Sequence, residues 1–513
     1  MAKKNLKPVF KAYSQHQVML LPPSLDELIK DNHPVRVVSD VIDKIDLDPL
    51  LKKFSGGGAG SYHPRMLLKV LVYAYIDNNY SSRRIEQALQ ANIHYMWISG
   101  MQQPDHNTIN RFRSERLKDV LRQIFTQVVL LLAQEGVLSI KELYVDGTKI
   151  EANAGRYTFV WGNAIKTNKE KIKKQLDELW KYAQNIAASE LPDNDPTRFD
   201  KIDADKVRQA VEQIDQALKD KPGVSAKVKQ KLNYAARNWP SNLSKYDGQE
   251  KILESRNSYS KTDIDATFMR MKEDHMLNGQ LKPAYNLQLS TNHQYIVDYS
   301  LHPNPTDTLT LPAHIAQHNN TFNELPDCIT ADAGYGSEQN YELMEKEGVE
   351  AFIKYNTFDR EQDRSKNNKH PFSAGKLYYN SQKDCYICPM GQTMHKIGTY
   401  EQTTAGGFRQ SLTKYSATNC EGCPLRGVCH KAKGNRIIEV NHNLIRHKQI
   451  ANEKLTSERG IYYRKKRPID VEPVFASIKH NHGFRRFMLR GKEKVLIEAG
   501  LVALAHNLRK KAA

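Results

Sequence analysis

The chain has 513 residues, of which 39% are hydrophobic and 26% are charged, enough for roughly two to four domains with buried cores. Lysine and arginine number 76 against 58 aspartate and glutamate residues, and the net charge of +18 favours a polyanionic partner, nucleic acid first. No apolar run approaches the roughly 18 residues that a membrane span requires, and the first residues lack the apolar core of a signal peptide. These features exclude membrane and secreted classes, and we expect a cytoplasmic protein.

The first part of the chain, residues 1–140, is predicted to form a helical domain. Its apolar residues recur every three or four positions, as on the buried face of a helix. The glycine-rich segment 55–61 lacks the Gly-Lys-Ser/Thr ending of a phosphate-binding loop and is interpreted as a turn. Two apolar stripes carry the helical prediction: Leu67, Leu68, Leu71, Val72 and Tyr75, then Leu117, Val120, Leu121, Ile124, Val128 and Leu131.

A short apolar strand, 143–145, follows and is predicted to end at Asp146. From 161 to 258 the chain is again helical and highly charged, and its apolar residues alternate spacings of four and three, as in coiled coils. Pro192 and Pro222 divide this stretch into arms. We interpret it as an inserted helical module, and the alternative is a helix layer of the core.

Strand patterns then return and alternate with helices. Segments 284–289 and 295–301 are predicted to form a hairpin, because a polar turn separates two apolar runs. The next predicted elements are a helix at 308–317, a strand at 328–331 that ends at Asp332, a helix at 340–346 and a strand at 351–354. This order predicts a mixed α/β sheet. A polar, cysteine-bearing stretch and a helical, basic C-terminal segment come after it.

Three carboxylates stand out at the ends of these elements: Asp146, Asp332 and Glu472. The two aspartates are predicted at the C-terminal ends of strands, which gather at one edge of such a sheet. Glu472, four residues after Pro468, is predicted in the first turn of a helix that could cross to the same point. Mg²⁺ prefers hard oxygen ligands, and two ions held by acids can activate a water or a 3′-hydroxyl against a phosphodiester. The trio therefore predicts metal-dependent chemistry on nucleic acid.

Short motifs surround these acids: Asp146-Gly-Thr148, Ala331-Asp-Ala-Gly-Tyr-Gly336, and Glu472 followed by six residues and Lys479. The helical domain has three more, Tyr62–Leu68, Ser81–Glu86 and Asp105–Arg113. Together they resemble the DDE transposases of the IS4/IS5-like superfamily, and most of all the IS1182 family of bacterial insertion sequences. The resemblance covers nearly the whole chain.

The resemblance implies a fold and a division into domains. The core would be RNase H-like, with a mixed sheet, and an all-helical N-terminal domain would bind DNA. A helical insertion would follow the first strand, and a cysteine-rich, zinc-binding insertion would precede the helix that carries Glu472. The implied limits are 1–140 for the N-terminal domain, 141–160, 259–356 and 441–513 for the core, 161–258 for the helical insertion and 357–440 for the zinc-binding insertion.

The resemblance also assigns roles to the acids. Asp146, Asp332 and Glu472 would be the catalytic residues and would hold Mg²⁺ or Mn²⁺. Lys479 would contact a DNA phosphate near the cleavage site. This lysine and Glu472 form the Glu-(6)-Lys half of the family's Tyr/Arg/Glu/Lys signature.

The other half of that signature departs from the family spacing, which is Tyr-(2)-Arg-(3)-Glu. Tyr463 and Arg467 are the nearest candidates, but each interval is one residue too long. Tyr462 and Arg464 are therefore alternatives for the tyrosine and the arginine. The assignment of Glu472 is little affected, because it depends on the lysine that follows.

Five of the six cysteines lie between Cys385 and Cys429, and such clustering in a reducing compartment suggests a metal site. Two Cys-x-x-Cys pairs suit a tetrahedral structural zinc, which has four thiolates and no open position. Pairing symmetry favours Cys385, Cys388, Cys420 and Cys423 as the ligands. The family pattern favours Cys388, Cys420, Cys423 and Cys429, and we prefer this set, with Cys385 as the alternative ligand.

Basic residues crowd around Glu472 and predict a surface for DNA phosphates. In the helical domain, Arg111 and Arg113 follow Asp105 on a predicted helix and are candidates for reading sequence. A solvated basic face without a ligand is the alternative interpretation. The candidate DNA contacts near the acid are Arg464, Arg467, Arg485 and Arg486, together with Tyr463 and Lys479.

The residues and the resemblance together predict a DNA transposase, bacterial and associated with the nucleoid. It would bind the terminal inverted repeats of its insertion sequence and would cleave and transfer DNA strands. Joining two transposon ends to a target requires a synaptic complex, so we expect a homodimer on double-stranded DNA. Two alternatives are a transposase-derived, metal-dependent DNA nuclease and a non-catalytic DNA-binding protein.

Overall fold

The computed structural model describes residues 24–54, 61–187, 191, 199, 201–271, 279–363 and 371–513. The chain divides into two compact units, one that ends at Phe112 and takes in 508–513, and another that spans Arg113–Asn507. The predicted glycine-rich turn lies, except for Ser61, outside the described residues, as does Pro192. Among the described helices, none is long and apolar enough to cross a membrane.

The first unit is helical, as predicted. Several of its helices are capped by a side chain at their N-terminus: the His33 ring accepts a hydrogen bond from the Val35 amide, and the Asp105 carboxylate accepts one from the Thr108 amide. The apolar stripe around Leu67 is buried. The helices are α1 (Pro34–Asp43), α2 (Asp48–Leu51), α3 (Pro64–Ile76), α4 (Ser82–Ala91), α5 (Ile93–Ile98) and α6 (His106–Arg111).

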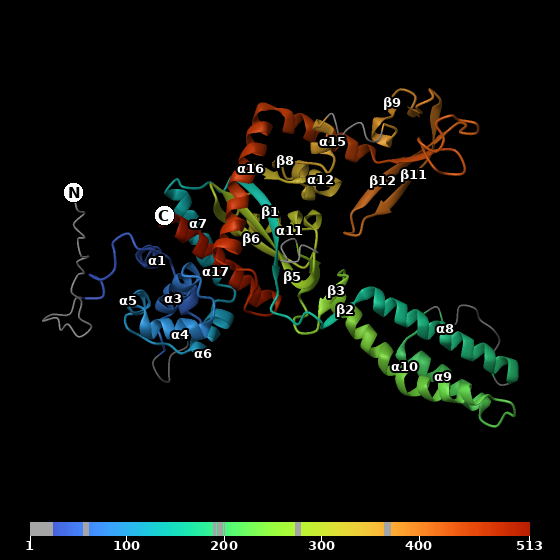
Figure 1. Cartoon of the computed structure of the whole chain (residues 1–513), viewed down its shortest axis with the longest axis horizontal. Helices are drawn as coiled ribbons and strands as arrows, with labels where there is room; N and C mark the ends of the chain where they lie inside the picture. The colour runs from blue at the N-terminus through green and yellow to red at the C-terminus, as the bar shows by residue number, and fades with distance from the viewer. Residues whose placement is uncertain are drawn as a thin grey trace, which may run out of the picture. The chain divides into compact units, whose positions relative to one another are not determined.

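The second unit is built on a mixed sheet, which confirms the predicted α/β class (Figure 1). The strands run in the order β4-β5-β1-β7-β8, and β6 also pairs with β5. β1, β7 and β8 are parallel to one another, whereas β5 is antiparallel to β1. The strands are β1 (Glu142–Glu151), β4 (Thr267–Arg270), β5 (Leu281–Asn292), β6 (Tyr295–His302), β7 (Cys328–Ala331) and β8 (Glu350–Ile353).

The predicted hairpin is β5 and β6. Two residues join the strands, His293 and Gln294, with φ of 52° and 63°. Two consecutive positive φ values are typical of the tight turns that match the twist of paired strands. Both strands extend beyond the predicted ends, since β5 has partners on both of its sides.

The prediction that the first strand ends at Asp146 is wrong. β1 continues to Glu151, and Asp146 lies in its middle, opposite Leu289 of β5. An Asp-Gly pair has low strand propensity and usually signals a turn. Here the long partner β5 extends the ladder through Gly147 to Glu151, so tertiary pairing overrides the local signal.

Helices pack on this sheet. α16 lies on β1, β5, β7 and β8, and α11 lies on β6. Arg122 of α7 forms an ion pair with the buried Asp298 and donates a hydrogen bond of 2.7 Å to the Tyr299 carbonyl, so α7 is fastened to β6. The helices are α7 (Leu121–Gln134), α11 (Leu311–Phe322), α12 (Glu338–Lys346), α15 (His442–Thr456), α16 (Glu458–Ala476) and α17 (Lys492–Lys511).

The prediction that Glu472 lies in the first turn of a helix is also wrong. α16 begins at Glu458, where the Ser457 hydroxyl accepts a hydrogen bond from the Gly460 amide, and Glu472 lies near its C-terminal end. The helix runs through Pro468 and Pro473, although a proline inside a helix costs about 3 kcal/mol. Packing of α16 on four strands offsets that cost, which the local sequence does not reveal.

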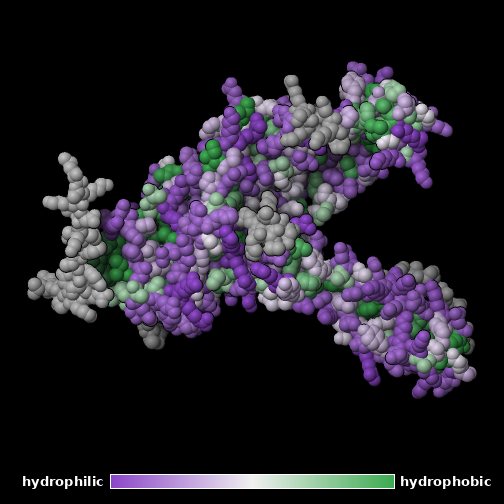
Figure 2. Space-filling view, in the orientation of Figure 1, coloured by the Kyte–Doolittle hydropathy of each residue, from purple (hydrophilic) through white to green (hydrophobic). Residues whose placement is uncertain are grey.

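A helical stretch with its own core lies between β1 and β4. Two short strands, β2 (Phe159–Trp161) and β3 (Ser258–Ser260), pair at its base. The predicted apolar seams are buried between the helices, and Figure 2 shows the outer surface of the helices as largely hydrophilic. The helices are α8 (Gly162–Ile186), α9 (Ala204–Leu218) and α10 (Ala226–Leu253).

The cysteine-bearing stretch contains a five-stranded antiparallel sheet that was not predicted. Tyr386, Met394, Tyr415 and Ile438 form the centre of its small core. β12 alternates between more and less exposed residues, but β11 is exposed along most of its length and lacks the period-two signal of a half-buried strand. The strands are β9 (Tyr378–Asn380), β10 (Cys385–Ile387), β11 (Thr393–Thr403), β12 (Arg409–Ala417) and β13 (Ile437–Val440).

Buried histidines make the second unit sensitive to acid. Burial lowers the pKa of His302 and of His318 to about 4, and it lowers the pKa of His314 as well. In the unfolded chain these groups titrate near pH 6.5, so the unfolded state binds protons first as pH falls. Their contribution to stability is therefore complete above about pH 6.5 and is lost as pH falls towards 4.

We expect His318→Met to reduce the loss of stability that occurs as pH falls. The loss of unfolding free energy between pH 7 and pH 5, measured by urea denaturation, should shrink by about 2 kcal/mol. His395→Gln, on an exposed position of β11, should leave the loss unchanged. An undiminished loss in His318→Met would contradict the assignment.

Candidate active site

The two aspartates lie side by side on neighbouring strands. β1 and β7 are parallel, with Val145 opposite Ala331, so the next residue of each strand is an aspartate. Arg467 of α16 brings one guanidinium nitrogen, Nη2, to 2.7 Å from Asp146 Oδ2 and 3.8 Å from Asp332 Oδ2. The structure therefore brings together Asp146 and Asp332, as the sequence predicted, and adds a cation between them.

Asp146 lies in a setting that disfavours its charge. Its side chain is 20% exposed, and its Oδ1 accepts a hydrogen bond of 2.8 Å from the Gly147 amide. Burial raises the pKa of Asp146 to about 6; the Arg467 guanidinium opposes this shift, and the Asp332 carboxylate adds to it. A nearby cation therefore stabilises the charged form of the Asp146 carboxylate.

Asp332 is held by the turn that follows β7. Its Oδ1 accepts a hydrogen bond of 2.8 Å from the Gly334 amide, which caps a short 3₁₀ turn, Ala333–Tyr335. A side chain at Gly336 would meet the Lys354 carbonyl at 2.3 Å, so the Ala-Gly-Tyr-Gly motif is needed for close packing of this turn on β8. The motif thus fixes the direction of the carboxylate.

A further acid, Asp307, borders the pair and was missed by sequence reasoning. Its Oδ1 accepts hydrogen bonds from Asn286 Nδ2 (2.8 Å) and Gln288 Nε2 (2.9 Å), and its charge contributes to the raised pKa of Asp146. The Tyr335 hydroxyl donates to Gln288, which continues the buried polar chain. Asp307 follows β6, as Asp332 follows β7, and that position was the available signal.

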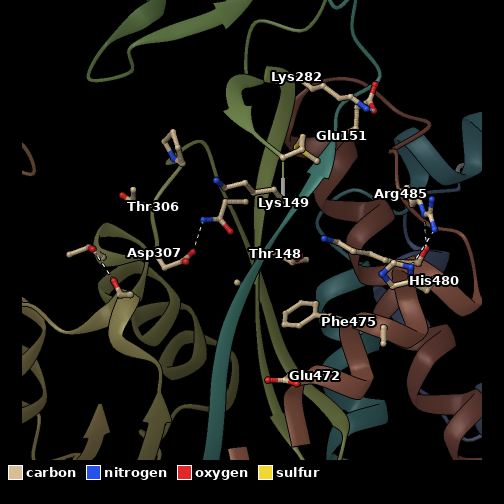
Figure 3. Close-up of a pocket in the computed structure, with 18 residues that line it drawn as sticks. Thr148, Lys149, Glu151, Lys282, Thr306, Asp307, Glu472, Phe475, His480 and Arg485 are labelled. Atoms are coloured by element: carbon tan, nitrogen blue, oxygen red, sulfur yellow. Dashed lines mark hydrogen bonds and ion pairs between the residues drawn. The ribbon is translucent and has the colours of Figure 1, made fainter. Parts of the chain in front are cut away.

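Glu472 lines a cavity of about 680 Å³ beside the aspartates. Gly147 and Gly334, next to the two aspartates, line the same cavity. Figure 3 shows Asp307 on one side of β1 and Glu472, with Phe475 from the same helix, on the other. The basic side chains that line it are Lys149, Lys282, Lys479, His480 and Arg485.

No three His, Cys, Asp or Glu side chains are arranged to hold a metal ion within the described ranges. Glu472 is thus near the aspartates without completing a metal-binding trio. The chemistry of the donors still suits a divalent cation, since Asp146 and Asp332 offer hard carboxylate oxygens. The Arg467 guanidinium is a stand-in cation between them.

The other residues predicted to contact DNA differ in their exposure to solvent. Arg111, Arg485 and Arg486 are exposed, and Arg464 is half-buried, with its guanidinium 5.0 Å from the centre of the Phe358 ring. Arg113 (3% exposed), Tyr463 (6%) and Lys479 (8%) are buried. Tyr463 packs against Phe352 in the core, with ring centres 4.7 Å apart, and so offers little surface to DNA.

The clustered cysteines fall into two groups by their location. Cys388, Cys420, Cys423 and Cys429 line one small cavity, together with His430 and Arg436, whereas Cys385 is buried on β10 apart from that cavity's lining. Backbone amides donate to two of the sulfurs: Gln392 to Cys388 Sγ (3.3 Å) and Arg436 to Cys420 Sγ (3.4 Å). The Arg436 Nη1 donates to Cys429 Sγ at 2.8 Å. These four cysteines are the set that the family pattern named, but among the described residues they form no metal-binding cluster.

Two family models match parts of the chain, and both describe transposases. Residues 23–115 match a model described as "Transposase domain (DUF772)", and residues 387–512 match one described as "Transposase DDE domain". No curated protein matches the chain. Glu472 lies inside the second match, whereas Asp146 and Asp332 lie between the two. The matches support a DDE transposase.

Gly147 is predicted to be essential for the geometry beside Asp146. A Cβ at this position would lie 2.1 Å from Gln288 Nε2 and 2.6 Å from Asp307 Oδ1. We expect Gly147→Ala to lower the free energy of unfolding by roughly 1–3 kcal/mol, through overpacking. The control is Gly398→Ala in β11, where no atom lies within 4 Å of the new Cβ. Equal urea midpoints for the two variants would refute the prediction.

Proposed function

We propose that this chain is a DNA transposase of the DDE type, which binds the terminal inverted repeats of its insertion sequence and catalyses metal-dependent cleavage and strand transfer. One observation carries the proposal: Asp146 and Asp332 share one guanidinium on adjacent parallel strands, between two segments that match transposase models. A transposase domain before these strands and a DDE domain after them fit the IS1182 family within the IS4/IS5-like superfamily.

The strand order supports an RNase H-like core. β1 carries Asp146, the β5–β6 hairpin supplies the second and third strands, and Asp332 follows the fourth strand, β7. Glu472 lies on a later helix that packs on the same sheet. This is the arrangement that the sequence resemblance implies for the catalytic core.

The proposed chemistry depends on acids that are fixed before substrate arrives. Asp146, Asp332 and Glu472 would hold the ions. Two Mg²⁺ or Mn²⁺ ions would supply Lewis acidity, which activates a water or a 3′-hydroxyl and stabilises the leaving oxygen. The amides of Gly147 and Gly334 keep the aspartates oriented. Such preorganisation lowers the reorganisation needed in the transition state.

Basic groups at the cavity would bind and orient the DNA backbone. Lys479 lines the cavity with Glu472, and Arg485, which donates to the Lys479 carbonyl at 3.1 Å, lies beside it. Phosphate contacts of this kind fix the register of a protein on DNA without reading sequence. Exposed Arg486 would extend this contact along double-stranded DNA, and exposed Arg111 of the first unit would supply a separate contact to the transposon ends. We propose a homodimer in the complex that joins two ends.

We further propose a structural zinc ion bound by Cys388, Cys420, Cys423 and Cys429. These four cysteines line one cavity, and four thiolates without an open position suit a structural zinc ion. The Arg436 guanidinium donates a hydrogen bond to Cys429 and so places a cation at this set of sulfurs.

We expect Asp332→Asn, Asp146→Asn and Glu472→Gln each to lower cleavage and strand transfer roughly 10³-fold or more, while DNA binding persists. The assay uses linear DNA with the element's end and Mg²⁺, and a gel shift measures binding. Glu458→Gln, at the exposed N-terminal end of α16, is the matched control and should retain activity.

The outcomes separate the alternatives. Full activity in Asp332→Asn would refute the catalytic assignment. Cutting without joining by the wild-type protein would favour the nuclease, and binding without cutting would favour the non-catalytic DNA-binding protein.

A second prediction concerns zinc content. Protein purified without chelator should hold one zinc per chain, measured by mass spectrometry of the metal. Cys420→Ser should lose it, because the three remaining thiolates bind zinc more weakly. Cys385→Ser, which removes a thiol outside the cavity lining, should keep it. Zinc loss in Cys385→Ser instead would shift the ligand set to the symmetric alternative.

A further inference from the structure

Arg467 connects the elements that carry the three acids. It projects from α16, the helix of Glu472, and its Nη2 contacts Asp146 on β1 at 2.7 Å and Asp332 after β7 at 3.8 Å. The Arg467 side chain is 15% exposed and that of Asp146 is 20% exposed, so their contact is shielded from solvent, whereas the Asp332 side chain is 44% exposed. Shielded charge pairs interact more strongly than surface pairs, and an arginine in such a place is expected to matter.

The ion pair offsets the repulsion between the two carboxylates while no metal ion is bound. Two carboxylates on adjacent strands repel each other, and burial further disfavours the charge of Asp146. A single guanidinium between them supplies the positive charge that their arrangement requires. Because Arg467 is rooted on α16, the same contact ties the helix of Glu472 to β1 and β7.

A divalent ion bound by both aspartates would compete with this guanidinium. An ion bound through Asp146 Oδ2 and Asp332 Oδ2 would use the oxygens that Arg467 now contacts, and the two positive charges would repel each other at such short range. Binding of the ion is therefore disfavoured while Arg467 contacts these oxygens.

On the basis of the proposed function, we propose that Arg467 is a positioning residue. It holds Asp146 and Asp332 together while no metal is bound, and it must release them when a divalent ion binds. The arginine-bound form is a competitor for the ion, so the apparent metal affinity of the protein is reduced by the fraction of molecules in that form.

Removing the guanidinium should raise the affinity for Mn²⁺ and lower the thermal stability of the protein without metal. Arg467→Gln should bind Mn²⁺ about tenfold more tightly, since the competing cation is gone. The same variant should unfold at a lower temperature without metal, since the two aspartates then repel each other unopposed. An ion pair that only supported the fold would give a variant that is less stable and binds metal no better.

The test uses the full chain without DNA and measures free Mn²⁺ by electron paramagnetic resonance, with thermal unfolding in parallel. Arg459→Gln is the matched control: it removes an arginine of α16 that pairs with Glu350 at 2.9 Å, outside the site, and should leave the Mn²⁺ affinity unchanged. Arg467→Lys keeps the positive charge and should bind Mn²⁺ within about threefold of the wild type.

The results separate this proposal from the proposed function. Mn²⁺ binding that requires Asp332, with equal or weaker affinity in Arg467→Gln, overturns the role of Arg467 alone. Binding that Asp332→Asn does not weaken means that the aspartates hold no metal, and it overturns both. Tighter Mn²⁺ binding in Arg467→Gln, with the control unchanged, supports the proposal that a divalent ion replaces Arg467 at the aspartates.

Discussion

The parallel pairing of β1 with β7 is the constraint on which the candidate active site depends. Its register makes Asp146 and Asp332 neighbours, because each follows a paired alanine or valine. Two acids so placed concentrate negative charge in a partly buried position, as the raised pKa of Asp146 reflects. The site must therefore recruit positive charge, and in this structure Arg467 supplies it. Most other features of the site follow from that requirement.

The two candidate metal sites share this physical logic. In one, a guanidinium nitrogen lies near one oxygen of each of two carboxylates; in the other, Arg436 contacts Cys429 beside three further thiols. In each set a backbone amide donates to one of the donor atoms, as to Asp332 Oδ1 and to Cys388 Sγ. Carboxylates that lie close together repel one another, and a nearby arginine offsets that cost.

Much of the fold could be predicted from local patterns. The β5–β6 hairpin, the limits of β7 and the position of Asp332 after it are all encoded in alternating apolar residues and turn residues. Local rules failed where long-range packing outweighed them. β1 runs through an Asp-Gly pair because β5 continues beside it, and α16 runs through Pro468 because it is packed on the sheet.

The sequence by itself determined which residue types are available for chemistry: the motif acids, the clustered cysteines and the excess of basic side chains. Only the tertiary structure decided their partners. It placed Arg467 on the aspartates, added Asp307 to their surroundings and buried Tyr463 in the core. These contacts join residues that are far apart in the chain, up to 321 positions for Arg467 and Asp146, and no local period or propensity records such pairings.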